Sequence, residues 1–160
     1  MFTEILAHIH PIIVHFPIAL IIIGCGYDAV LAVRRRALPP GQGLWLWLLA
    51  AAGAWAAIAT GPDDDARGVT SFIEPHETLA TLTAWTVTLI AAWRLLMLWK
   101  GNRAFVRIPL ALYIAVSVAS CGLVLGTGYY GGKMVYTDGV GVSANGAAVN
   151  PPHSSSHRGG

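Results

Sequence analysis

Apolar residues gather in four long stretches. Short segments rich in charged residues, proline and glycine lie between them. The stretches cover, to within a few residues, 11–33, 44–60, 76–99 and 106–129. Each is roughly 17 to 25 residues long, which a helix rising about 1.5 Å per residue needs to cross a hydrocarbon core about 30 Å thick. Because a segment in hydrocarbon must satisfy its own backbone hydrogen bonds, we expect four transmembrane helices.

The polar segments indicate where the domain ends. Prolines and glycines follow the first two apolar stretches, at Pro39-Pro40-Gly41 and Gly61-Pro62. The final residues, SANGAAVNPPHSSSHRGG, are small, polar and interrupted by prolines, and such a composition buries too little apolar surface to order itself. We therefore predict one four-helix transmembrane domain over residues 1–142 and a disordered C-terminal tail over residues 143–160.

The overall composition supports a membrane location. Hydrophobic residues make up 55% of the 160 residues and charged residues 11%, against roughly 25% charged in ordinary soluble domains. The formal net charge of +2 is too small for a nucleic-acid-binding surface. These values argue against a soluble enzyme domain, a nucleic-acid-binding protein and a disordered chain, and they make the lipid bilayer the expected partner.

The distribution of basic residues predicts the orientation. The first connection holds Arg34, Arg35 and Arg36, and the third holds Lys100, Arg103 and Arg107. The opposite face has fewer basic residues: Arg67, Lys133 and Arg158. Since Lys and Arg are in excess on the cytoplasmic side, we expect a multi-pass protein of the bacterial inner membrane with both termini periplasmic.

Rows of small residues favour close packing of the helices. Ala111, Ala115 and Ala119 recur every four residues, and Gly53, Ala57 and Gly61 do the same in the second stretch. Such rows let helix backbones approach in lipid, although chance in an alanine-rich chain also produces them. We expect an all-α fold, a compact four-helix transmembrane bundle.

Four histidines fall on the predicted outer side: His8, His10 and His15 around the start of the first helix, and His76 at the start of the third. Imidazole is a common ligand of haem iron, zinc and copper. His10 and His15 are five residues apart, which places them about 140° apart around a helix. One of them would therefore pair with His76 across the bundle. We predict His15 and His76 as the axial ligands of a haem iron, with His10 as the substitute for His15. The alternatives are a quinone or metal-ion site, or histidines that only bond headgroups and helix ends.

An ionisable pair is expected at the inner side. An unpaired aspartate in hydrocarbon costs about 2.5 to 3.5 kcal/mol, and Arg94 lies at the depth in the third helix that Asp28 has in the first. We predict that Asp28 and Arg94 form a structural pair, unless Asp28 reaches the interface alone. The two cysteines, Cys25 and Cys121, lie in apolar runs and are interpreted as small hydrophobic residues that fill space.

The glycine-rich segment after the fourth stretch, residues 126–142, has two interpretations. Its tyrosines suit the headgroup region, which favours an aromatic belt followed by a flexible exit. The segment could instead fold as a cap over the outer end of the helices, next to the histidines.

The opening HPIIVHFPIAL, residues 10–20, closely resembles that of a bacterial family of predicted four-helix membrane proteins of unknown function. The ending Gly131-Gly132-Lys133-Met134-Val135-Tyr136, followed by Gly-Val-Gly-Val, resembles the same family. The family commonly has a histidine before that Gly-Val-Gly-Val, where this chain has Asp138. Some relatives are joined to iron–sulfur or cytochrome-like redox domains, and the resemblance therefore implies an electron-transfer setting.

Together these observations predict a small inner-membrane electron-transfer protein with non-covalent haem b near its periplasmic face. The absence of a C-x-x-C-H motif argues against covalent haem. Two axial histidines leave no open iron position, so a role as an electron-transfer subunit with a periplasmic or membrane redox partner is expected rather than catalysis. The alternatives are a structural or assembly subunit of a larger complex without a cofactor, and a quinone-binding subunit.

Overall fold

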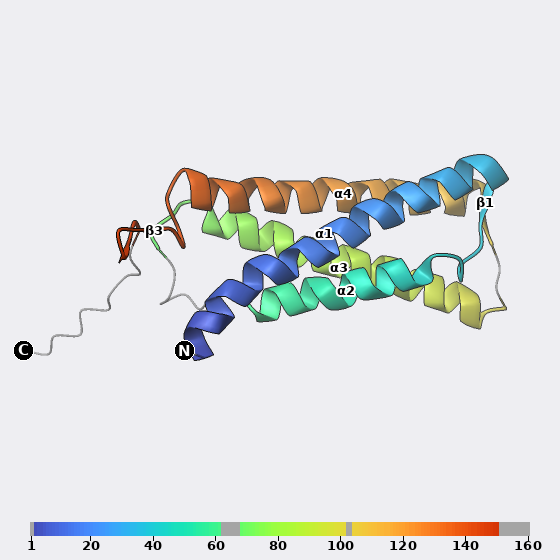
Figure 1. Cartoon of the computed structure of the whole chain (residues 1–160). Helices are drawn as coiled ribbons and strands as arrows, with labels where there is room; N and C mark the ends of the chain where they lie inside the picture. The colour runs from blue at the N-terminus through green and yellow to red at the C-terminus, as the bar shows by residue number, and fades with distance from the viewer. Residues whose placement is uncertain (1, 62–67, 102–103, 151–160) are drawn as a thin grey trace, which may run out of the picture.

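The computed structural model describes residues 2–61, 68–101 and 104–150, and four helices make up most of them. They are α1 (Phe2–Arg35), α2 (Leu44–Ala59), α3 (Ile73–Trp99) and α4 (Arg107–Tyr136). The helices lie along one long axis and alternate in direction (Figure 1). Each packs on the next in sequence, and α4 packs on α1 as well.

The structure also has two short pairs of strands, which the prediction of an all-α fold did not include. β1 (Ala37–Leu38) and β2 (Phe105–Val106) pair antiparallel and join the α1–α2 connection to the start of α4. β3 (Ser143–Ala144) and β4 (Ala147–Ala148) form a hairpin after α4. Residues 143–148 are therefore ordered where the composition predicted the beginning of a tail, and residues 151–160 lie outside the described part.

The two ends of the molecule differ in the residues they carry. We call the end with β1 and β2 the arginine end, because Arg34, Arg35, Arg36, Lys100 and Arg107 lie there. We call the other the histidine end; it holds the start of α1, the end of α2, the start of α3 and the end of α4 (Figure 1). Arg67, Arg103 and Arg158, which entered the orientation argument, lie outside the described residues.

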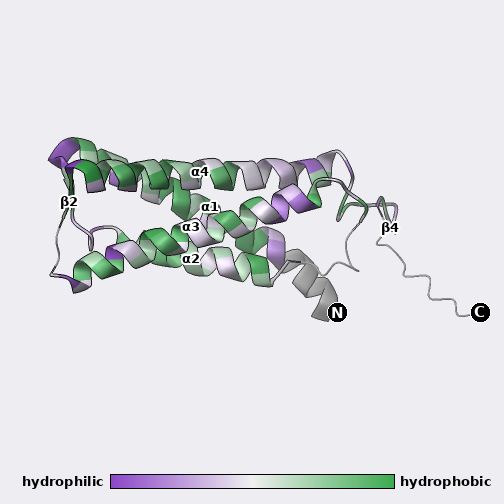
Figure 2. Ribbon diagram, turned by 180° about the vertical axis from the view of Figure 1, so that it is seen from behind, coloured by the Kyte–Doolittle hydropathy of each residue, from purple (hydrophilic) through white to green (hydrophobic). Residues whose placement is uncertain are grey.

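Three helices are long and apolar enough to cross a membrane: His10–Arg35, Ile73–Trp99 and Arg107–Tyr136. The remaining helix, α2, is also apolar, but it has 16 residues, which corresponds to a length of roughly 24 Å. In Figure 2 the middle of each helix is mainly hydrophobic and the polar residues gather toward the ends. The structure is thus mostly helical, with three candidate membrane spans and one shorter apolar helix.

The observed helices are longer than predicted at two places. α1 runs through Pro11 and Pro17, and α4 continues to Tyr136 through a glycine-rich segment. Proline and glycine disfavour helix interiors in water. In hydrocarbon no other partner is available for the backbone, so the helix is retained despite the unfavourable residues.

Tightly buried side chains are concentrated in the half of the molecule nearer the arginine end. They form one cluster that includes Leu20, Ile21, Trp47, Ala50, Val87, Ile90, Phe105, Tyr113 and Val124. Gly53 lets α2 approach α1 closely, since an added Cβ would lie 3.3 Å from Phe16 and Pro17. The predicted row Ala111, Ala115 and Ala119 of α4 is instead exposed, so it does not bring helices of this chain together.

Candidate functional site

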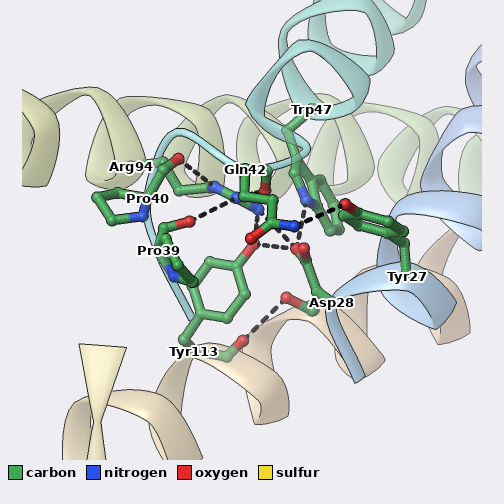
Figure 3. A network of polar contacts seen from close by, with 9 residues as sticks. Tyr27, Asp28, Pro39, Pro40, Gln42, Trp47, Arg94 and Tyr113 are labelled. Atoms are coloured by element: carbon green, nitrogen blue, oxygen red, sulfur yellow. Dashed lines mark hydrogen bonds and ion pairs between the residues drawn. The ribbon is translucent and has the colours of Figure 1, made fainter. Parts of the chain in front are cut away.

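A buried cluster of polar residues joins all four helices around Asp28 of α1 (Figure 3). Its Oδ2 atom accepts a hydrogen bond from each of the other three helices. Trp47 Nε1 of α2 donates at 2.7 Å, Arg94 Nη1 of α3 at 2.7 Å and the Tyr113 hydroxyl of α4 at 2.6 Å. Asp28, Trp47, Arg94 and Tyr113 have no exposed surface, so the carboxylate is withdrawn from water and fully surrounded.

Arg94 uses its remaining donors on the α1–α2 connection. Its Nε donates to the carbonyl of Pro40 at 2.9 Å, and its Nη2 donates to the carbonyls of Pro39, at 3.4 Å, and Gln42. The guanidinium therefore satisfies backbone carbonyls that have no helical partner and pairs with a carboxylate at the same time. These contacts hold the connection against α3 at the arginine end.

Gly43 completes the packing next to this cluster. Its backbone has a φ of 78°, a conformation that side chains with a Cβ rarely adopt. A Cβ there would also lie 2.8 Å from the Tyr27 ring and 3.7 Å from Asp28 Oδ1. That Oδ1 atom is buried without a hydrogen-bond partner in the part of the chain that the structure describes.

The structure contains the salt bridge between Asp28 and Arg94 expected from the sequence, at 2.7 Å. Trp47 and Tyr113 were not expected as part of it. The sequence nevertheless contained a sign of their role. Both side chains carry an N–H or O–H donor near the end of a helix, at the same depth as Arg94. With one carboxylate oxygen shared by a cation and two neutral donors, the cluster is suited to holding helices together.

The histidines occupy different environments at the histidine end. His15 is exposed on α1, and its Nδ1 bonds the carbonyl of Pro11 in the preceding turn. His10 is partly buried, and its Nδ1 lies 3.4 Å from the Thr60 hydroxyl at the end of α2. The side chain of His8, as well as His153 and His157, lies outside the described residues.

His76 is held in a defined orientation between α3 and α4. Its Nδ1 lies 2.9 Å from the carbonyl of Thr127, so this nitrogen must carry the proton and donate it. The other nitrogen, Nε2, then has the free electron pair that a metal ligand needs. Gly131 allows the approach, since a Cβ at that position would lie 3.3 Å from His76 Cε1.

A shallow groove lies beside His76. It has a volume of about 390 Å³ and is lined by Glu74, Pro75, Thr78, Leu79 and Tyr130. Among the described residues there is no cluster of three or more His, Cys, Asp or Glu side chains that could hold a metal ion.

The residues after α4 fold back on the residues that precede α3, whereas residues 126–136 of the segment interpreted as a possible cap continue helix α4. Asn150 Oδ1 accepts from the Val69 amide at 2.9 Å, and its Nδ2 donates to the carbonyls of Val69 and Asp138. The Asp138 carboxylate accepts from the Thr70 hydroxyl. The ammonium group of Lys133 lies 4.8 Å from the centre of the Phe72 ring. These contacts hold the residues that lead into α3, and His76 lies in the first turn of that helix.

Comparison with known proteins identifies the family. Residues 7–144 match the family described as a predicted membrane protein, DUF2231, and because this is most of the chain, the protein belongs to that family. No curated protein and no solved structure matches the chain significantly. The chain is thus a membrane protein of a family without an assigned activity.

Proposed function

We propose that this member of the DUF2231 family is a b-type haem protein of the bacterial inner membrane that transfers electrons near the periplasmic face. In this proposal the arginine end lies in the cytoplasm, because Lys and Arg mark that side. Both termini and the histidine end are then periplasmic. The four helices span or enter the bilayer as one bundle.

The observation that carries the proposal is the exposure of the side chains at the histidine end, where His10 and His76 lie. Among the described residues, the segments 10–16, 55–60, 73–82 and 125–136 contain no buried side chain. On α4 this part without a buried side chain extends over 12 residues, or roughly 18 Å. In this proposal an apolar group such as haem lies against these partly exposed helix surfaces and covers them.

His76 is the best supported ligand, because its Nδ1 proton is donated to Thr127 and its Nε2 is free. The second ligand comes from the start of α1. We prefer His10 for this role to His15, which the sequence favoured, because His10 is partly buried whereas His15 is exposed. Haem would supply one-electron chemistry when bound, and ligation by two histidines would leave it suited to electron transfer with a periplasmic or membrane partner.

The test is the absorption spectrum of the full chain produced with haem supplied. We expect a Soret band and an α-band that sharpens on reduction, and loss of haem in the His76→Ala protein. His10→Ala should lose more haem than His15→Ala. Full haem occupancy in His76→Ala, or protein without any visible band, would contradict the proposal.

Two glycines of α4 provide a matched pair of variants. Gly131→Ala places a Cβ against the His76 ring, whereas Gly128→Ala enters open space with no atom within 4 Å. Both changes improve helix propensity by the same amount, roughly 1 kcal/mol. We expect weaker haem retention or a shifted spectrum in Gly131→Ala only. Identical haem binding in the two variants would show that the orientation of His76 is unimportant.

A quinone site is the second candidate, favoured by the groove beside His76. Glu74, Thr78 and Tyr130 line it together with apolar surface, the composition expected for a polar ring attached to an apolar tail. In that case the purified protein has no visible spectrum of haem, and a quinone analogue protects it against thermal unfolding. Glu74→Gln and Thr78→Val should then abolish the protection.

A further inference from the structure

Two arginines come together at one end of the short β1–β2 ribbon. The ribbon is antiparallel, with Ala37 opposite Val106. Arg36 directly precedes Ala37, and Arg107 directly follows Val106, so the same register places the two arginines beside each other. One follows the last residue of α1 and the other is the first residue of α4. The fold therefore brings together two cations from distant parts of the chain.

The backbone at both positions is unfavourable for arginine. Arg36 and Arg107 each have a φ of 51°, in the left-handed region that residues with a Cβ rarely adopt. Directly after a helix, as at Arg36, this conformation usually belongs to glycine. Like charges opposite each other across two strands also repel. Backbone strain of this kind is concentrated at ligand-binding sites, and an anion bound by both side chains would offset the repulsion.

No carboxylate of the described chain neutralises these two arginines. Among the described residues, Asp28 is the only acidic one in this half of the molecule, and its carboxylate is buried against Arg94. Arg36 and Arg107 are both exposed and form no ion pair within the described part of the chain. Polar residues gather visibly at this end in Figure 2. A countercharge must therefore come from outside the chain.

Large apolar side chains are exposed at the same end. Ile108, next to Arg107, is 81% exposed, and Trp99 at the end of α3 is 84% exposed. Trp45 at the start of α2 is exposed as well. Tryptophan is enriched at the headgroup level of a bilayer, and a guanidinium binds phosphate through two parallel hydrogen bonds. A phosphate that carries acyl chains matches both features, whereas a nucleic acid or an acidic peptide would match only the charge.

We propose that Arg36 and Arg107 together bind the phosphate group of an anionic membrane lipid. The acyl chains of that lipid remain in the surrounding bilayer. Arg34 and Lys100, which are exposed at the same end, add to the positive potential but are not part of the site. The site requires neither haem nor the groove beside His76, and headgroups are present at whichever membrane face the arginine end occupies.

The experiment uses the purified full chain in detergent micelles. The probes are phosphatidylglycerol and phosphatidylcholine with identical acyl chains, and native mass spectrometry counts the lipids that each chain retains. We expect retention of one phosphatidylglycerol per chain in preference to phosphatidylcholine. Glycerol phosphate, which has the anionic group without acyl chains, should not displace phosphatidylglycerol at equal concentration. The same result is expected in protein prepared without haem and in His76→Ala.

Two double variants with the same loss of charge test the site itself. Arg36→Gln/Arg107→Gln should weaken phosphatidylglycerol binding by at least about tenfold, because charge-assisted hydrogen bonds to the phosphate are lost. Arg34→Gln/Lys100→Gln removes equal charge from exposed positions of the same end and should retain most of the binding. Without anionic lipid, the first variant should unfold at a temperature no lower than the unchanged protein, since the repulsion between the arginines is gone.

Three results would overturn the proposal. Equal weakening in the two double variants would show that this end attracts lipids only through its overall charge. Equal retention of phosphatidylglycerol and phosphatidylcholine would show that the headgroup charge is not recognised. Full displacement by glycerol phosphate would assign the two arginines to a soluble phosphate compound instead of a lipid.

Discussion

Asp28 shows at the scale of a residue how a charge is retained in an apolar core. Its placement in hydrocarbon costs about 2.5 to 3.5 kcal/mol, and one oxygen atom receives three donors that offset this cost. A buried pair contributes little net stability compared with apolar residues, but removal of one partner leaves an uncompensated charge. Asp28 and Arg94 should therefore be strongly coupled.

Asp28→Asn should lower the free energy of unfolding by about 3 to 5 kcal/mol, because Arg94 then has no countercharge in the core. The double variant Asp28→Asn/Arg94→Gln should recover part of this loss. Thermal or chemical unfolding in detergent micelles measures both values. Strictly additive effects of the two single changes would show that the pair does not interact energetically.

Gly43→Ala tests the packing beside Asp28. The change should cost at least about 1 to 2 kcal/mol, since the residue has a φ of 78° and its Cβ would overlap the Tyr27 ring. Gly41→Ala is the control in the same connection, where the added Cβ makes an ordinary contact with Leu98 at 3.4 Å. Equal melting temperatures for the two variants would contradict this explanation.

At the scale of elements, side chains from distant parts of the chain hold the connections. Arg94 of α3 binds the carbonyls of the α1–α2 connection, and Asn150 binds the segment that leads into α3. Neither contact involves sequence neighbours. The helices therefore depend on these long-range contacts for the position of their ends, and His76 depends on the second of them.

Asn150→Ala should release the segment that follows α4. The side chain makes three hydrogen bonds, two to Val69 and one to Asp138, and its removal leaves these backbone groups to water. We expect faster amide exchange at Val69 and earlier proteolysis between residues 138 and 150. Ser143→Ala, at an exposed position of β3, should leave both unchanged. Unchanged exchange in Asn150→Ala would show that other contacts hold the segment.

At the scale of the whole molecule, the buried side chains are concentrated toward the arginine end. The half toward the arginine end contains the buried cluster and the Asp28 contacts, and the half toward the histidine end contains His10 and His76 in partly exposed positions. In the haem proposal, the bound group lies at the histidine end, near one membrane surface. The orientation then decides which compartment that group faces.

Reporter fusions test the orientation. Fusions after Arg36 and after Gly101 should report the cytoplasm, and fusions after Gly61 and after Asn150 should report the periplasm, because of the excess of basic residues at the arginine end. The reverse pattern would place His76 at the cytoplasmic face and would exclude a periplasmic redox partner.

The sequence by itself determined the membrane character, the four helices and a countercharge for Asp28. These properties depend on the length of apolar runs and on the cost of a charge in hydrocarbon, and both are readable residue by residue. Only the tertiary structure decided how each helix is rotated. It turned His15 outward and His10 toward α2, and it brought Trp47 and Tyr113 to Asp28. The reason is that helices in lipid are apolar on all sides, so their hydrophobic pattern has no preferred face from which a rotation could be predicted.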